Sequence, residues 1–223
     1  EVNMLGRTKK IHFVGIGGVG MSGIAEFLHN QSFTITGSDL NKTETTRHLE
    51  SLGITVYHGH DPLNVSDVDV VVKSSAVNDS NPEVAYALSQ KIPVIRRAEM
   101  LAELMRMSYG IAIAGTHGKT TTTSMVGLVL VEAGLDPTII VGGKVKNFGS
   151  NNILGSGKHI VVEADEYDRS FLTLTPIIAG ITNIEADHLD CYKNLDDIKC
   201  AFIEYGNKVP FFGCTVVCLD DRG

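Results

Sequence analysis

Short β-branched runs alternate with amphipathic stretches along all 223 residues of the chain. This alternation predicts strands joined by helical crossovers, which build parallel sheets covered by helices. We therefore expect an α/β fold. The expected strands are 11–16, 33–38, 54–57, 68–72, 92–95, 111–114, 138–141, 159–163, 177–181 and 215–219, and the expected helices end near residues 28, 52, 91, 106, 133 and 205.

The strand–helix series restarts near Tyr109, and this restart predicts two domains. Residues 1–107 form a Rossmann-like parallel-sheet domain in this interpretation, and residues 108–223 form a P-loop-type α/β ATPase domain. The chain ends shortly after its last expected strand, so we expect the second domain to be incomplete.

Charge and composition disfavour several function classes. Lys and Arg number 19 and Asp and Glu number 26, which gives a formal net charge of −7. A negative protein repels nucleic acid and anionic membranes, so we expect neither as a partner. No apolar run is long enough for membrane insertion. A disulfide framework would be spread along the chain, so the cysteines predict reduced core side chains in a cytoplasmic protein. They are Cys191, Cys200, Cys214 and Cys218.

A first glycine-rich loop, Gly15-Ile-Gly-Gly-Val-Gly20, lies between an expected strand and an expected helix. Its G-x-G-x-x-G spacing lets the backbone approach a pyrophosphate, which then lies at the positive end of the helix. Asp39 follows the second strand, where an acidic residue usually meets a ribose hydroxyl. By itself the pattern indicates a dinucleotide such as NAD. The alternative is that the glycines serve only the packing of the strand against the helix.

A second glycine-rich loop, Gly115-Thr-His-Gly-Lys-Thr-Thr-Thr-Thr123, is again placed between a strand and a helix. Its end, Gly118-Lys119-Thr120, matches the end of a P-loop, although the standard spacing would require a glycine at Ile113. In a P-loop the backbone N–H groups hold phosphates, the lysine reaches the β- and γ-phosphates and the hydroxyl binds Mg²⁺. The loop therefore predicts an ATP site.

Two acidic clusters follow expected strands of the second series. They are Glu163-Ala-Asp-Glu166 and Asn183-Ile-Glu-Ala-Asp-His188-Leu-Asp190. The carboxyl ends of parallel strands line the ligand crevice of an open sheet. Carboxylate oxygens and an imidazole at that edge predict the completion of a magnesium site that begins at Thr120.

Taken together, these motifs resemble those of the Mur ligases of peptidoglycan synthesis over nearly the whole chain. Further segments that carry the resemblance are Gly37-Ser-Asp39 and Ser74-Ser-Ala-Val77. Mur ligases have a UDP-substrate domain, an ATPase domain and a C-terminal Rossmann-like domain, and this chain resembles the first and part of the second. The resemblance implies an ATP-dependent ligase that joins L-alanine to the carboxylate of UDP-N-acetylmuramate through an acyl phosphate.

The resemblance also implies roles for individual residues. The UDP-N-acetylmuramate contacts would be Gly15, Gly17, Gly18, Val19, Gly20, Asp39, His60, Ser75 and Arg97. The ATP contacts would be Gly115, Thr116, His117, Gly118, Lys119, Thr120 and Thr121. Thr120 and Glu163 would hold one Mg²⁺ and His188 a second, so that Lys119, Glu163 and His188 are the expected catalytic residues.

Alternatives remain open at this point. Tyr167 stands where a related ligase of murein tripeptide often has tyrosine, so that ligase is one alternative. The region where sister ligases carry a carbamylated lysine holds Ala201, Phe202 and Ile203, so we do not expect that modification. An NAD-dependent dehydrogenase would use the first glycine loop but would leave the second unexplained. A non-catalytic nucleotide-binding module is the remaining alternative.

Overall fold

The computed structural model of the chain describes residues 5–141, 152–187 and 191–220, apart from the side chains of Val19, Asn152 and Asp168. The chain divides between Met100 and Leu101 into two compact units.

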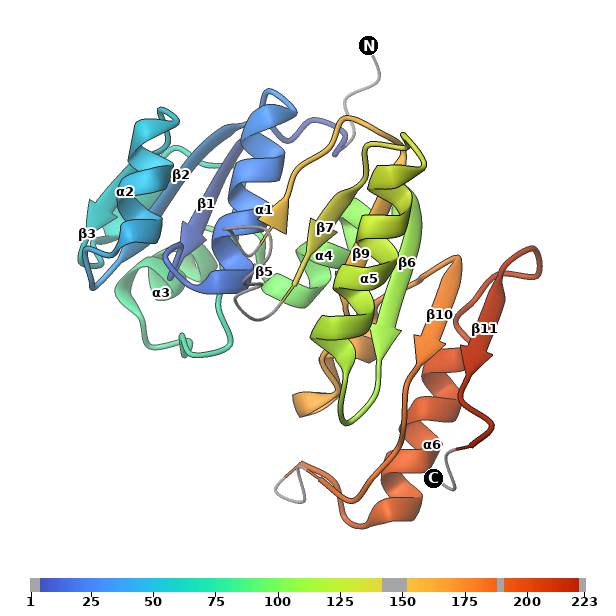
Figure 1. Ribbon diagram of the computed structural model, residues 1–223. Helices are drawn as coiled ribbons and strands as arrows, with labels where there is room; N and C mark the ends of the chain where they lie inside the picture. Colours follow the sequence, from blue (N-terminus) through green and yellow to red (C-terminus); the bar gives the residue numbers. More distant parts are fainter. Residues whose placement is uncertain (1–4, 142–151, 188–190, 221–223) are drawn as a thin grey trace. The chain divides into compact units, whose positions relative to one another are not determined.

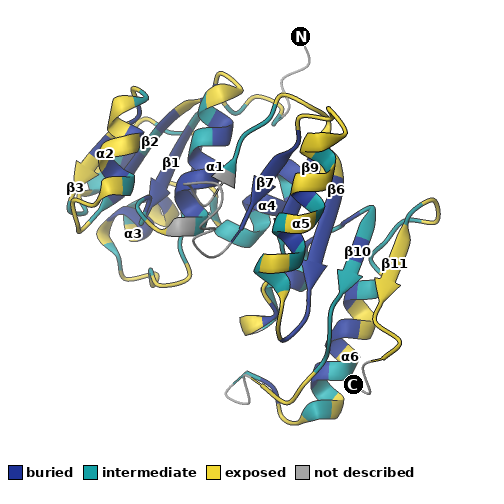
Figure 2. Ribbon diagram, viewed as in Figure 1, coloured by how far each residue is buried: buried dark blue, intermediate teal, exposed yellow. Residues whose placement is uncertain are grey.

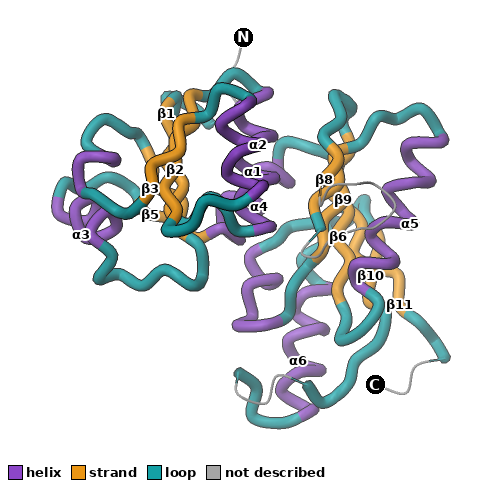
Figure 3. Tube along the Cα trace, turned by 60° about the vertical axis from the view of Figure 1, so that its left-hand side comes forward, coloured by secondary structure: helices purple, strands orange, loops and turns teal. Residues whose placement is uncertain are grey.

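The first unit contains a five-stranded parallel sheet with the strand order β3-β2-β1-β4-β5. Figure 3 shows α1 and α2 on one side of this sheet and α3 on the other. This is the predicted doubly wound arrangement. Its elements are β1 (Lys10–Val14), α1 (Val19–Asn30), β2 (Thr34–Asp39), α2 (Glu44–Ser51), β3 (Thr55–His58), η1 (Pro62–Val65), β4 (Val70–Lys73), α3 (Pro82–Ser89) and β5 (Val94–Arg96). Helix α4 (Arg97–Arg106) contains the boundary between the units.

Local sequence signals fix the helix starts in this unit. Thr43 caps α2 through two reciprocal hydrogen bonds. The Thr43 hydroxyl accepts from the Thr46 backbone N–H, and the Thr46 hydroxyl accepts from the Thr43 backbone N–H. Asn81 caps α3, and Pro82 takes the first helical position as the sequence predicts. The 3-10 turn η1 was not predicted from the sequence.

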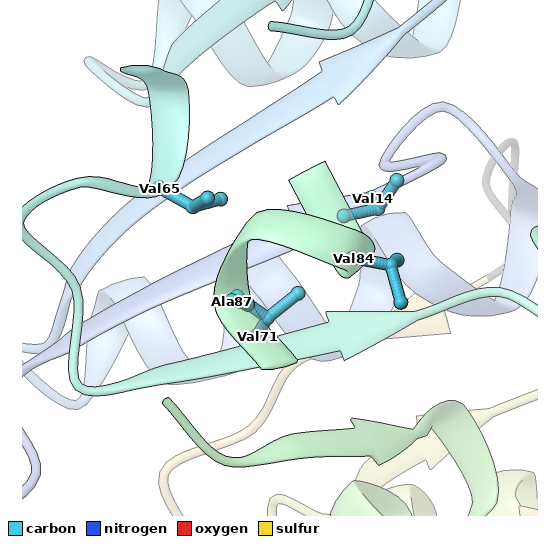
Figure 4. Packing of buried hydrophobic residues seen from close by; sticks show 5 residues of the cluster. All are labelled: Val14, Val65, Val71, Val84 and Ala87. Atoms are coloured by element: carbon cyan, nitrogen blue, oxygen red, sulfur yellow. The ribbon is translucent and has the colours of Figure 1, made fainter. Parts of the chain in front are cut away.

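An apolar cluster packs α3 and η1 against the sheet. Its buried members come from β1, β4, η1 and α3 and lie together in Figure 4. They are Val14, Val65, Val71, Val84 and Ala87. Burying such side chains contributes about 1.5–3 kcal/mol each for the larger ones, so this cluster is a major source of stability for the unit.

The second unit contains a six-stranded sheet with the order β11-β10-β6-β9-β7-β8 (Figure 1). Helix α5 packs on β6, β7 and β9, and α6 packs on β10 and on the 3-10 segment η2. Its elements are β6 (Tyr109–Ala114), α5 (Lys119–Glu132), β7 (Thr138–Ile140), β8 (Asn152–Ile153), β9 (His159–Glu163), η2 (Tyr167–Thr173), β10 (Ile178–Ile181), α6 (Leu195–Gly206) and β11 (Cys214–Val217).

Two features of this unit differ from the sequence-based expectations. The strand β8 pairs antiparallel with β7, whereas only parallel pairs were expected. The expectation that the cysteines pack in the core is wrong, because Cys200, Cys214 and Cys218 are exposed and Cys191 is half-buried. Cys214 lies in β11, an edge strand whose four residues are exposed (Figure 2). All four cysteines are free thiols.

Within the part of the chain that the structure describes, no helix combines the length and the apolar character needed to cross a membrane.

Candidate active site

The predicted substrate residues of the first unit gather at one edge of its sheet. The strand order places β1 and β4 side by side, with the chain running outward in opposite directions from this pair. In open parallel sheets a ligand crevice forms at such a switch point, outside the carboxyl ends of the strands. The loop after β1 begins at Gly15, Asp39 ends β2, Ser75 follows β4 and Arg97 follows β5.

The first glycine loop is held in shape by the end of β2. The Ser38 carbonyl accepts from the backbone N–H groups of Gly15, at 2.8 Å, and Ile16, at 3.0 Å. The Asp39 carboxylate accepts from Gly17 N–H at 2.9 Å and from Asn41 N–H at 3.0 Å. Gly15 has φ +80°, which glycine adopts without strain. Asp39 therefore shapes the loop, in addition to the ribose contact that the sequence predicted for it.

The mouth of this loop combines helix donors with a cation. Helix α1 begins at Val19 with Gly18 as its N-cap, and the first N–H groups of a helix have no carbonyl partner inside the helix. A Cβ atom built on Gly20 would lie 2.9 Å from Nη1 of Arg97. Only a glycine lets the guanidinium come this close to the helix start. The arrangement suits a diphosphate, because both the helix end and the guanidinium attract anions.

His60 and Ser75 occupy different environments. Nδ1 of His60 lies 3.0 Å from the hydroxyl of Ser38 and 2.8 Å from a carboxylate oxygen of Glu83. Ser75 is exposed in a turn that is closed by a hydrogen bond from Val77 N–H to the Ser74 carbonyl. His60 is thus tied to the sheet edge, while Ser75 lies on the surface.

In the second unit, the loop after β6 is pinned to the segment after β10. The Thr116 N–H donates to the Asn183 carbonyl at 3.1 Å, and the His117 N–H donates to Asn183 Oδ1 at 2.9 Å. In return, the Thr182 hydroxyl and the Asn183 amide donate to the His117 carbonyl. The Thr116 hydroxyl accepts from Glu185 N–H at 2.9 Å. These contacts occupy the N–H groups of Thr116 and His117.

The open donors of this loop lie at the start of α5 instead. The helix begins at Lys119, and its N-cap Gly118 is left-handed with φ +82°. Thr120 and Thr121 share the first turn, whose N–H groups lack intrahelical partners. The His117 side chain is exposed and its Nε2 lies 3.7 Å from a carboxylate oxygen of Glu185.

The Lys119 ammonium is directed into the loop. It donates to the carbonyls of Gly115 and Thr116 at 2.7 and 3.2 Å, and it lies 2.8 Å from the Glu166 carboxylate. The Lys119 and Glu166 side chains are only 14% and 3% exposed, so this is a buried ion pair. The Glu166 carbonyl accepts from the hydroxyl of Tyr192 at 2.6 Å, and burial raises the pKa of that hydroxyl to about 12. Tyr192 therefore remains a donor that holds Glu166 in place.

Thr120 and Glu163 lie together at the carboxyl ends of β6 and β9. The Thr120 hydroxyl donates to Oε2 of Glu163 at 2.9 Å. Hard oxygen atoms of this kind fit Mg²⁺, which binds through one or two protein groups and completes its shell with water and phosphate oxygens. Among the described residues there is no cluster of three or more His, Cys, Asp or Glu side chains able to hold a metal. The remaining predicted ligand, His188, lies outside the described residues.

Sequence reasoning missed the importance of three residues. Glu83 belongs to none of the motifs of the sequence analysis, although it contacts His60. The sequence analysis placed Glu166 in an acidic cluster and predicted no ion pair for it. In the structure it forms an ion pair with Lys119. Asn183 was named only as the first residue of an acidic cluster, although its side chain bonds to both backbone groups of His117. The only available signal was the pair of strand ends that precede Glu166 and Asn183.

Comparison with known proteins decides the family. The profile of the Mur ligase family catalytic domain matches residues 10–109, and that of the Mur ligase middle domain matches residues 113–223. A solved structure from Neisseria meningitides, UDP-N-acetylmuramate:L-alanyl-gamma-D-glutamyl-meso-diaminopimelate ligase, is 32% identical. The alignment covers 96% of this chain and 72% of that one, with a TM-score of 0.86. The chain belongs to the Mur ligase family.

Two further proteins that this Mur ligase resembles are both named as alanine ligases. The UDP-N-acetylmuramate–L-alanine ligase of Geotalea uraniireducens is 62% identical over 218 residues, which cover 98% of this chain and 48% of that protein. The structure of UDP-N-acetylmuramate-alanine ligase from Thermotoga maritima is 35% identical, with a TM-score of 0.84, and covers 96% of this chain and 50% of that one. The chain thus spans about half the length of the curated relatives it matches.

Proposed function

We propose that the full-length protein joins L-alanine to the carboxylate of UDP-N-acetylmuramate with hydrolysis of ATP to ADP and phosphate. The observation that carries the proposal is the contact between Thr120 and Glu163 beside the Lys119 ammonium. It combines a cation for phosphate oxygens with two oxygen ligands for magnesium. A dinucleotide-dependent dehydrogenase needs neither of these.

The UDP-sugar is assigned to the first unit. Support comes from the glycine loop held by Ser38 and Asp39, and from Arg97 beside the first turn of α1. A diphosphate carries two or more negative charges, which suit the helix start and the guanidinium. The proposed contacts of the sequence analysis, His60 and Ser75, belong to the same sheet edge.

L-Alanine is favoured as the amino acid over a murein tripeptide by sequence rather than by fold. The curated alanine-ligase relative is 62% identical, and among the solved structures the alanine ligase is 35% and the tripeptide ligase 32% identical. The TM-scores of the two neighbouring structures, 0.84 and 0.86, do not separate the alternatives. Tyr167, the position at which this chain resembles the tripeptide ligases, is 45% exposed.

The proposed chemistry is activation of an acyl group. The substrate carboxylate attacks the γ-phosphate of ATP, which yields an acyl phosphate and ADP, and the alanine amine then displaces phosphate. Lys119 stabilises charge on the transferring phosphoryl group, and the N–H groups at the start of α5 hold phosphate oxygens. Thr120 and Glu163 would hold Mg²⁺, which neutralises phosphate charge when bound, and His188 is the proposed ligand of a second ion. The reaction needs no Ser or Cys nucleophile.

We also assign the reaction to the cytoplasm. The support is that all four cysteines are free thiols, as expected in a reducing compartment that also supplies ATP.

The test is phosphate release by the full-length enzyme with each substrate omitted in turn. We expect release to require ATP, UDP-N-acetylmuramate and L-alanine together, and murein tripeptide to replace L-alanine poorly. Release with tripeptide but not with L-alanine would select the alternative ligase. Release without any amino-acid substrate would contradict the proposed reaction.

A further inference from the structure

A charged carboxylate lies in the interior of the first unit. Glu83 belongs to the first turn of α3 and its side chain is 0% exposed. A buried charge is costly unless hydrogen bonds compensate for the water that it loses. The carboxylate therefore requires an explanation.

Hydrogen bonds surround this carboxylate. Oε2 accepts from the Ser38 hydroxyl at 2.5 Å and lies 2.8 Å from Nδ1 of His60. Oε1 accepts from the Asn64 amide at 2.7 Å, and Nε2 of His12 lies 3.6 Å away, which is an electrostatic contact rather than a hydrogen bond. Burial raises the pKa of Glu83, but His12, Ser38 and Asn64 together lower it to about 2. The group is an ionised acceptor at neutral pH.

This arrangement determines which nitrogen of His60 carries a proton. Ionised Glu83 has no proton to donate, so a contact of 2.8 Å requires a proton on Nδ1. The Ser38 hydroxyl gives its only proton to Glu83, and its oxygen can therefore only accept from Nδ1, 3.0 Å away. Both neighbours demand the same assignment. In a neutral imidazole, Nε2 is then an acceptor.

Ser38 connects the carboxylate to the first glycine loop as well. The hydroxyl of Ser38 bonds to Glu83, while its carbonyl accepts from Gly15 and Ile16 N–H. The position of the loop start is thus linked to the carboxylate by one residue. Two parts of the proposed substrate site, the loop and His60, meet at Ser38, whose hydroxyl donates to Glu83.

We propose that Glu83 is a positioning residue of the UDP-substrate site, which keeps the His60 proton on Nδ1 and presents Nε2 as an acceptor to a hydrogen-bond donor of the nucleotide. The inference rests on the proposed function for the identity of the ligand. The proton on Nδ1 of His60 does not depend on the proposed function, because it follows from contacts within the chain.

The first measurement is the tautomer of His60 in the full-length protein labelled with ¹⁵N at histidine. The signal is assigned by its loss in His60→Gln. We expect a protonated Nδ1 and an unprotonated Nε2 at neutral pH, in the absence of ligand. A proton on Nε2 in the unaltered protein, in a neutral or a doubly protonated ring, overturns the proposal, whatever the folding of any variant.

The second measurement is the effect of Glu83→Gln on that tautomer and on binding of UDP. We expect a change of the His60 tautomer population and about tenfold weaker UDP binding, with ATP binding retained. The matched control is Glu50→Gln, since Glu50 lies 3.2 Å from Nε2 of His58 in an exposed pair of the same unit. This control is expected to leave both readouts unchanged.

The third measurement is the double variant Glu83→Gln with His60→Gln. If Glu83 acts through His60, the double variant binds UDP nearly as well as His60→Gln alone. Additive losses, or weaker UDP binding with an unchanged tautomer, contradict the proposal. If the unaltered protein shows the expected tautomer but does not bind UDP, the proposed function fails while the protonation of His60 stands.

Discussion

The Lys119 ammonium lies 2.8 Å from the carboxylate of Glu166, and both side chains are largely buried. The cation expected to meet ATP phosphates is therefore paired with a carboxylate from another segment of the sheet edge. Phosphate binding has to share or displace this partner. The pair links the loop after β6 to the segment after β9.

Replacing Lys119 by alanine is expected to slow phosphate release by the full-length enzyme severely. Loss of a cation that stabilises transition-state charge lowers the rate by about a thousandfold. UDP-N-acetylmuramate binding, measured by calorimetry, is expected to change little because its proposed site lies in the first unit. Lys158→Ala is the control, since Lys158 is exposed and precedes β9 at the strand end opposite to Glu163. Wild-type turnover by Lys119→Ala would show that this loop does not bind ATP.

Glu166→Gln is expected to lower the free energy of unfolding by about 3 kcal/mol, because it leaves the Lys119 ammonium without its anionic partner. Urea denaturation of the full-length protein measures the change. The comparison is Glu103→Gln, which removes an exposed partner of Arg106 and is expected to cost under about 1 kcal/mol. Equal costs for the two variants would mean that burial adds nothing to the Lys119 pair.

Thr120→Val and Glu163→Gln are each expected to raise the magnesium concentration needed for half-maximal activity. Both remove an oxygen from the proposed metal site. Because the two side chains contact each other, the double variant is expected to show less than the sum of the single effects. His188→Ala belongs to the same series, as the proposed ligand of a second ion. A magnesium dependence that stays the same in all three single variants places these residues outside the metal site.

Gly115→Ala is expected to destabilise the second unit by more than about 2 kcal/mol. Gly115 has φ +135°, and a Cβ atom there would lie 2.0 Å from the Thr182 hydroxyl. In a Thr182→Ala background the added cost of Gly115→Ala is expected to be smaller, because that overlap is removed. Gly53→Ala, with φ +90° and open space around its Cβ, measures backbone strain alone at about 1 kcal/mol. A cost for Gly115→Ala no larger than for Gly53→Ala would contradict the close packing.

Stability is expected to fall between about pH 4.5 and pH 2 through the titration of Glu83. Its pKa is lowered in the folded chain from 4.5 to about 2, so its contribution is fully present above the unfolded value. The contribution is lost as the pH falls through the folded value. Thermal unfolding as a function of pH measures this loss, and Glu83→Gln is expected to flatten the profile over that window. A profile that is equally steep in the variant assigns the loss to other carboxyl groups.

The alternation of the sequence predicts the main strands and helices because each has a local cause. Asn81-Pro82 predicts the start of α3, and glycines predict both glycine-rich loops between a strand and a helix. The strand β8 was not predicted, because its two residues, Asn152 and Ile153, are too few to show a periodic pattern. They become a strand by pairing with β7.

The candidate site is less predictable than the fold. Residue type and spacing single out Lys119 and Thr120, but the partners of a side chain depend on which strand ends the sheet order brings together. The sequence distance between Glu83 and Ser38, or between Lys119 and Glu166, gives no local signal of contact. Glu83 also follows a helix cap, where an acidic residue is ordinarily explained by the helix dipole alone.

The hydrogen bonds that join Thr116 and His117 to the segment 182–185 have a consequence for protein engineering. The glycine-rich loop is one half of a two-part structure, and the other half lies more than sixty residues further along the chain. A graft of the loop alone into another α/β scaffold would lack the Asn183 side chain that bonds to His117. A chimaera between two ligases therefore has to carry both segments from the same parent to keep the loop in its native conformation.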